Sequence, residues 1–216
     1  MDVTEALRKR HMVRSFSDRP LDAGLVDDIL TDALRSPTAG NTRGTAWLVL
    51  EGPEQTAGYW SHTTTEEWRR RSRRWPGLSN APVVALSLAS PTAYVLRYGE
   101  SDKAGSSLGP PLTEGTDDGE PAGQGGEGAW PVPYWFGDAA FATMALLLRA
   151  TAEALGTCFL GNFRGEDSLL PALGVPPEWR LFGTVLLGFP AGDDPPSSSL
   201  SRPAPSAASR LHRGSW

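Results

Sequence analysis

An almost wholly apolar run at residues 139–148 constrains the fold of this chain more than any other stretch. It lies inside a predicted helix from Trp135 to Gly156, where Gly156 acts as the stop signal. A helix that is apolar on all sides has to be covered on all sides, either at the centre of a domain or by a second subunit. The small side chains within the run permit close approach of another helix. We therefore expect a helix at the centre of the fold or in a dimer interface.

Hydrophobic periodicity predicts the remaining elements. Helices are expected at residues 2–10, 22–35, 53–74, 91–98 and 166–173, and strands at residues 45–50, 83–88, 157–161 and 181–189. The chain is expected to form one domain over residues 1–216. A loop rich in Gly, Pro and acidic residues interrupts it at about 99–130, and an extended arm follows at about 190–216.

The formal charge of −5 and the pI near 5.2 argue against nucleic acid or an anionic membrane as a partner. The basic run at residues 69–74 is interpreted as a favourable helix C-terminus. Cys158 is the only cysteine, which excludes an internal disulfide and a cysteine-rich metal site. With no apolar run long enough to span a bilayer, the expectation is a cytoplasmic protein with no bound metal.

The basic stretch at residues 10–16, with the sequence RHMVRSF, contains Arg10, His11 and Arg14 between two predicted helices. These side chains can converge on one compact anion, and a guanidinium matches the oxygens of a phosphate. A solvated helix end is the alternative interpretation of the same residues.

Standard catalytic motifs are absent from the sequence. There is no P-loop, no nucleophile elbow and no zinc-protease motif. A G-x-G-x-x-G match at residues 123–128 lacks the preceding strand and following helix of a dinucleotide site, so we reject it. A chain without reactive side chains in a motif is a candidate for chemistry that a bound cofactor supplies.

Four segments in register carry a resemblance to a known family. They are RHMVRSF at 10–16, SPTAGNTR at 36–43 before a strand with Trp47, LGTCFLG at 155–161 after the apolar helix, and LGFP at 187–190. Together they resemble the FMN-dependent nitroreductase family over nearly the whole chain. The tail around Arg202 is also similar to the C-terminal arm of members that return a basic residue to the flavin phosphate.

The resemblance implies an α+β, three-layer fold with a mixed central sheet flanked by helices. It also implies a homodimer in which the long helices pack together and FMN lies across the interface. The residues that match cofactor-binding positions fall into four groups: Arg10, His11, Met12 and Arg14 at the phosphate and ribityl chain; Pro37, Thr38, Ala39, Asn41 and Arg43 at the flavin ring; Leu160 and Gly161 beneath the flavin; and Arg202 on the returning arm.

Two positions depart from the family pattern. Met12 stands where a small hydroxyl residue is usual, which removes one phosphate donor. Arg43-Gly44 stands where Gln-Pro is frequent, and no lysine matches the position that often places a positive charge near the flavin. We therefore hypothesise that Arg43 supplies this charge and stabilises the reduced, anionic flavin.

The function that the resemblance implies is a ping-pong oxidoreductase, in which NAD(P)H reduces FMN and an oxidised small molecule, such as a nitroaromatic or a quinone, then takes the electrons. Two alternatives stay open: an FMN-dependent oxidase or desaturase of a peptide or biosynthetic intermediate, and a non-catalytic flavin-binding interaction protein. Trp130, Tyr134, Trp135 and Phe136 are candidates for stacking on a flat substrate. Aromatic packing at a helix start is the alternative interpretation of these four residues.

Overall fold

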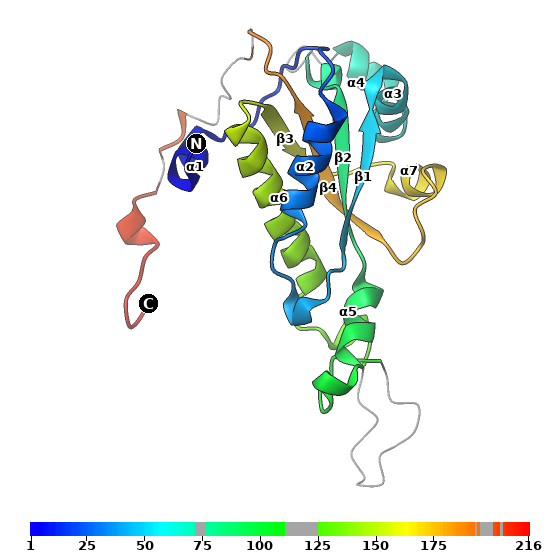
Figure 1. Cartoon of the computed structure of the whole chain (residues 1–216), viewed down its shortest axis with the longest axis vertical. Helices are drawn as coiled ribbons and strands as arrows, with labels where there is room; N and C mark the ends of the chain where they lie inside the picture. Colours follow the sequence, from blue (N-terminus) through cyan, green and yellow to red (C-terminus); the bar gives the residue numbers. More distant parts are fainter. Residues whose placement is uncertain (72–76, 111–124, 193, 195–200, 204) are drawn as a thin grey trace.

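A four-stranded sheet in the order β1-β2-β4-β3 forms the centre of the protein (Figure 1). The structure, a computed structural model, describes residues 1–71, 77–110, 125–192, 194, 201–203 and 205–216. The strands are β1 (Thr45–Glu51), β2 (Val83–Ala89), β3 (Gly156–Leu160) and β4 (Arg180–Gly188). The resemblance predicted a mixed sheet, but these strands pair only antiparallel. β2 and β3 do run in the same direction, yet β4 lies between them and is antiparallel to both.

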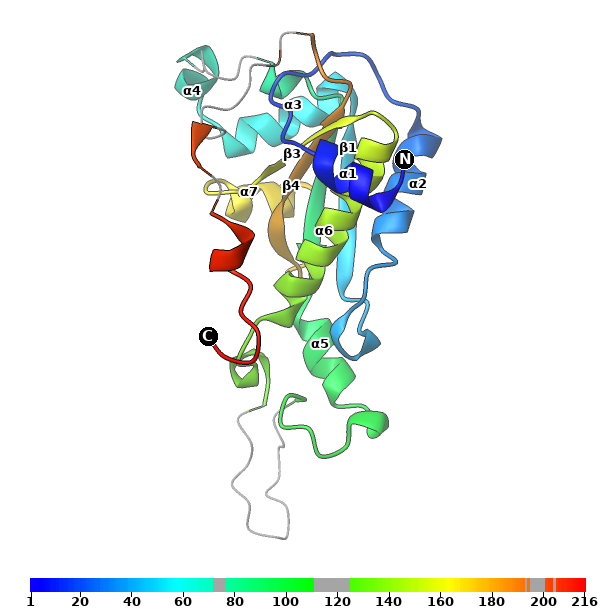
Figure 2. The same cartoon turned by 90° about the vertical axis from the view of Figure 1, so that its left-hand side faces the viewer.

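Helices cover both faces of this sheet (Figures 1 and 2). α2 (Ala23–Ala33) and α6 (Tyr134–Ala152) pack on one face, and α3 (Gly52–Thr63) and α7 (Glu166–Ala172) pack on the other. β2 shows how the sequence produces this arrangement, because successive side chains of a strand point to opposite faces. Val84 and Leu86 join the core with α3 and α7, whereas Val83 and Ala85 join the core with α2 and α6.

The predicted helix at residues 53–74 is two helices, because the described part of this segment breaks at Thr64. After α3 the chain leaves the helical conformation, and α4 (Glu66–Arg71) begins anew. The hydroxyl of Thr65 accepts a hydrogen bond from the backbone N–H of Trp68 (3.0 Å) and so caps the new helix. Residues 72–74 lie outside the described part.

Shorter elements complete the described chain: α1 (Val3–Lys9), α5 (Pro91–Tyr98), and 3₁₀ turns η1 (Ala39–Asn41), η2 (Leu78–Asn80), η3 (Ser101–Lys103), η4 (Glu127–Ala129) and η6 (Ala207–Ser209). α5 coincides with its predicted range. The predicted loop at 99–130 contains η3 and η4, while residues 111–124 lie outside the described part. Among the described helices, none combines the length and apolar composition that crossing a membrane requires.

The prediction that Gly156 stops the long helix was wrong. α6 ends at Ala152, and Ala154 takes the left-handed backbone conformation (φ 59°). Gly156 instead opens β3, where an added Cβ would lie only 2.9 Å from Cγ2 of Val13. The glycine therefore serves close packing of two chain segments. The outer side of α6 is open within one chain, since Phe141 is 56% exposed and Met144 is 36% exposed.

Candidate functional site

The basic stretch at residues 10–16 lies along the outer edge of β3. Met12 forms a parallel bridge with Thr157, and the backbone N–H of Val13 donates to the Thr157 carbonyl (2.8 Å). The backbone N–H of Phe159 approaches Sδ of Met12 at 3.3 Å. This pairing brings two of the predicted cofactor-binding segments together, because β3 leads directly to Leu160 and Gly161.

The basic side chains of this stretch differ in their surroundings. Arg14 is half-buried, and its Nη1 donates to the Met12 carbonyl (3.1 Å). Its backbone N–H donates to the Oδ1 atom of Asp194 (2.9 Å), a contact that sequence reasoning missed. Arg10 is half-buried and His11 is exposed. The stretch therefore brings Arg10 and Arg14 to one edge of the sheet, with the Asp194 carboxylate beside the Arg14 backbone.

A pocket of about 320 Å³ opens beside Leu160 and Gly161. Its aromatic wall comes from α3 and α4, where the Trp60 and Trp68 rings stack with centroids 6.3 Å apart. Leu78 also lines it. Sequence reasoning missed this wall, because nothing in the pattern of residues 59–78 indicates that α3 folds back beside β3.

The pocket lies next to the basic stretch. The backbone N–H of Phe16 donates to the carbonyl of Gly77 (3.0 Å), the residue before Leu78. An added Cβ on Gly77 would lie 2.3 Å from Oγ of Ser15, so the two segments touch closely. A ligand with an anionic end and a flat apolar part could therefore contact the basic stretch and the aromatic pocket at the same time.

Side chains from three elements fix the backbone at one side of the pocket. The Thr184 hydroxyl donates to Oδ1 of Asn162 (2.9 Å), and Nδ2 of Asn162 lies 3.4 Å from the Tyr59 hydroxyl. Burial raises the pKa of Tyr59, so its phenol stays protonated and uncharged. Asn162 directly follows Gly161, and its anchored side chain therefore holds the Leu160–Gly161 backbone in place.

The loop at residues 38–43 lies at the opposite end of the sheet. It leads into Thr45, which pairs with Ala89, whereas the basic stretch adjoins the end where Glu51 pairs with Val83. Val83 pairs in turn with Leu187 of β4, and Leu187 pairs with Thr157. At about 3.3 Å per residue, the length of β1 separates these two ends by about 20 Å. One chain thus does not bring this loop to the basic stretch.

Asp138, in the N-terminal part of α6, holds the loop. Asp138 is buried, with only 3% of the residue exposed. Its Oδ2 atom accepts hydrogen bonds from the Ala39 backbone N–H (2.7 Å) and the Tyr94 hydroxyl (2.7 Å). A pocket of about 220 Å³ adjoins this carboxylate and is lined by Thr38 and Arg43. Pro37, Asn41 and Arg43 are exposed. Asp138, the one acidic residue of α6, was the overlooked signal.

The four predicted substrate-stacking residues divide into two groups. Trp130 and Trp135 are each 7% exposed and pack edge-on against Tyr94. Tyr134 is exposed, and Phe136 is half-buried with its ring near that of Phe182. Of the four, Tyr134 and Phe136 are thus the more accessible to a substrate.

The C-terminal tail places Arg202 in an exposed position. The described part of this tail extends along the outside of the protein, away from the central sheet (Figures 1 and 2). Among the described residues, no group of acidic, His and Cys side chains forms a candidate metal site.

Comparisons with known proteins point in one direction. Residues 7–105 and 117–189 match the model of the nitroreductase family. A candidate NADH dehydrogenase/NAD(P)H nitroreductase from Archaeoglobus fulgidus is 22% identical over 96% of this chain and 94% of its own length. Two solved structures share the fold. A candidate nitroreductase from Desulfovibrio desulfuricans in complex with FMN has a TM-score of 0.65 and 20% identity, covering 100% of this chain and 98% of that one. Nitroreductase CinD from Lactococcus lactis, in complex with nicotinic acid, has a TM-score of 0.66 and 16% identity, covering 95% and 100%.

Proposed function

The chain belongs to the nitroreductase family, and from this premise we propose that it is an FMN-dependent oxidoreductase. In this proposal NAD(P)H supplies reducing equivalents and an oxidised small molecule, such as a nitroaromatic or a quinone, receives them in a second half-reaction. The observation that carries the proposal is the position of the basic stretch beside Leu160, Gly161 and the adjoining aromatic pocket. The similarity to a protein in complex with FMN supports the choice of cofactor.

The phosphate of FMN would be held by Arg10, His11 and Arg14. Met12 fits this arrangement although it lacks a hydroxyl, since its sulfur lies against the backbone N–H of Phe159 at the edge of β3. The side chain therefore packs on the sheet, and the cationic neighbours supply the charge-assisted contacts. Arg202 on the exposed tail would add a further cation from the other end of the chain.

The flavin ring would lie against Leu160 and Gly161. Gly161 is exposed, and the three atoms nearest to an added Cβ there all belong to the ring of Phe163, the nearest at 3.3 Å, so a flat ligand can approach the backbone closely. When bound, FMN supplies the hydride chemistry. The chain positions the ring, and the aromatic wall of α3 and α4 limits the access of water to it.

We propose that the complete site needs a second copy of the chain. The loop with Thr38, Ala39 and Asn41 lies about 20 Å from the basic stretch along the strands, so a loop from a partner would complete the flavin site. The exposed Phe141 and Met144 offer an apolar surface on α6 for a two-fold contact. A contact at this surface would also bury the exposed apolar side of α6, as the composition of the helix requires.

The absorbance spectrum of the purified protein, followed during anaerobic addition of NADH or NADPH, tests the proposal. We expect a yellow protein whose flavin absorbance bleaches on reduction and returns on addition of a nitroaromatic or a quinone. A colourless protein that does not take up FMN would overturn it. Reduction by an organic substrate but not by NAD(P)H would assign an oxidase or desaturase instead, and FMN binding without any reduction would assign a non-catalytic role.

A further inference from the structure

The loop at residues 38–43 has an unusual backbone conformation. Gly40, Asn41 and Arg43 all have positive φ angles, of 62°, 54° and 57°. For residues other than glycine this conformation is strained and persists only where the surroundings determine it strongly. The contacts that hold the loop therefore determine its shape.

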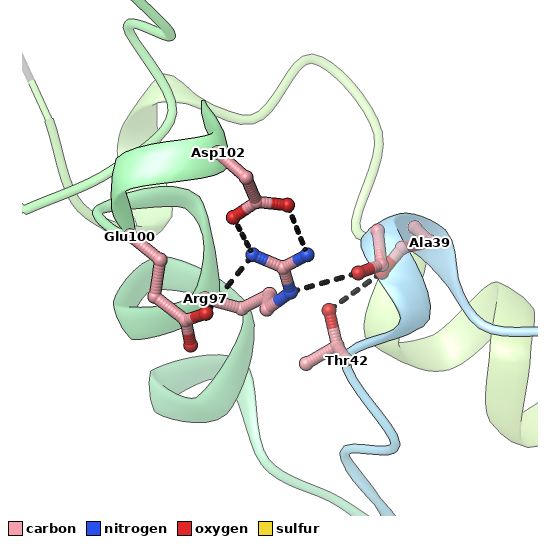
Figure 3. Close-up of polar contacts among 6 residues, drawn as sticks. Ala39, Thr42, Arg97, Glu100 and Asp102 are labelled. Atoms are coloured by element: carbon pink, nitrogen blue, oxygen red, sulfur yellow. Dashed lines mark hydrogen bonds and ion pairs between the residues drawn. The ribbon is translucent and has the colours of Figure 1, made fainter. Parts of the chain in front are cut away.

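Arg97, near the C-terminal end of α5, binds the middle of this loop (Figure 3). Its Nε donates to the Gly40 carbonyl (2.8 Å), while Nη1 and Nη2 form a fork with the two carboxylate oxygens of Asp102 (2.6 and 2.7 Å). Nη1 also contacts Glu100 (3.1 Å). The Arg97 side chain is only 19% exposed, and its charge is balanced by these two carboxylates. The adjacent guanidinium lowers the pKa of Asp102, so this carboxylate stays ionised at neutral pH.

Two further residues contact the same loop, Asp138 at Ala39 and Tyr98 at Gly40. Asp138 binds the backbone N–H of Ala39, so consecutive residues are fixed by two unrelated side chains. The ring of Tyr98 lies so close that a Cβ on Gly40 would approach its Cε2 to 2.7 Å. A side chain at this position would therefore strain the backbone and displace the Tyr98 ring.

We propose that Arg97 is a positioning residue for the flavin, which acts by fixing the loop at 38–43. Through Glu100 and Asp102 it also ties this loop to the first residues of the 99–130 segment. The inference rests on the proposed function, in which this loop meets the flavin ring of the partner. Arg97 itself does not contact the cofactor in this proposal.

Binding of FMN and of riboflavin to the flavin-free full-length protein tests the proposal, with fluorescence as the readout. Riboflavin lacks the phosphate, so a residue that acts at the ring affects both ligands, whereas a phosphate contact affects FMN alone. We expect Arg97→Ala to weaken both ligands by a similar factor of about tenfold, the effect of one charge-assisted hydrogen bond. Arg97→Lys should weaken both ligands to a similar degree, because a lysine has neither the Nε donor nor the two Nη donors that bind a carboxylate together. Arg14→Ala should weaken FMN alone.

Arg180→Ala is the matched control, because Arg180 also donates to a turn carbonyl, that of Pro177 (2.6 Å), but contacts neither the loop nor the basic stretch through that bond. It should leave both affinities unchanged. If Arg97→Ala fails to fold by circular dichroism, Asp102→Asn carries the test, since it retains the arginine but removes the charge from its fork. A smaller, equal loss for both ligands is then expected.

Unchanged affinities in a folded Arg97→Ala or Asp102→Asn variant would overturn the inference, as would a loss confined to FMN. The two proposals fail in different ways. A wild-type chain that binds neither ligand contradicts the proposed function, whereas a wild-type chain that binds FMN while the variants match it contradicts only the role of Arg97.

Discussion

Met12 and Thr157 pair as a parallel bridge at the free edge of β3. The contact joins the basic N-terminal stretch to the strand that leads to Leu160 and Gly161, two segments that lie far apart in the sequence. It makes the position of the proposed phosphate-binding residues depend on the sheet, because residues 10–16 form no helix or hairpin of their own.

Arg14→Ala should weaken FMN binding by roughly tenfold to hundredfold, the range for loss of a hydrogen bond to a charged group. Arg202→Ala should also lower FMN retention. Isothermal titration of flavin-free protein measures the effect. Arg8→Ala, an exposed cation on α1, is the control and should bind FMN like wild type. Equal affinities for all variants would contradict the phosphate assignment.

Arg43→Ala should make the reduction potential of the bound flavin more negative. The physical reason is that a fixed positive charge near the ring stabilises the anionic reduced form. Spectroelectrochemical titration against a reference dye measures the potential. An unchanged potential would show that Arg43 does not supply the charge.

Phe141→Glu should convert the proposed dimer into monomers and lower its FMN retention. The substitution places a charge on the exposed apolar face of α6, where desolvation in an interface is costly. Light scattering coupled to gel filtration reports the mass, and Leu96→Glu on the exposed side of α5 is the control. A variant that stays dimeric with bound FMN would place the interface elsewhere.

Tyr94→Phe should lower the free energy of unfolding by about 1.5–3 kcal/mol, because it removes a hydrogen bond to the buried Asp138 carboxylate. Burial, and then the bond to Asp138, raise the pKa of Tyr94, so the phenol remains a donor across the accessible pH range. Urea unfolding measures the change. Tyr134→Phe, at an exposed ring, should have no comparable effect, and equal stabilities of the two variants would contradict the assignment.

Cys158 should not react with a thiol reagent at pH 8 in the folded protein, yet should react fully in denaturant. Burial raises its pKa from 9.0 to about 11, which outweighs the opposing effect of Arg14, and the thiolate is the reactive form. Since the folded pKa is the higher one, the thiol contributes stability below pH 9, and this contribution is lost as the pH rises towards about 11. Rapid labelling of the folded protein would contradict the buried position.

The sequence by itself determined the local elements and the chemical character of the segments that resemble the nitroreductase family. The periodicity of residues 91–98 and the β-forming run from Thr45 predict α5 and β1 closely, because helices and strands follow spacings of a few residues. It also contained the signal for the break after Thr64, since the hydroxyl of Thr65 stands before two glutamates as a helix cap, although the predicted helix ran through it.

Only the tertiary structure decided which of these segments meet. Local periodicity carries no information about the pairing of Met12 with Thr157, the approach of α3 to Leu160, or the burial of Asp138 against Ala39 and Tyr94. For the same reason, the sequence does not show that the loop at 38–43 and the basic stretch lie at opposite ends of the sheet within one chain. Backbone hydrogen bonding fixes each element locally, but register and packing between distant segments set the distances from which a site is built.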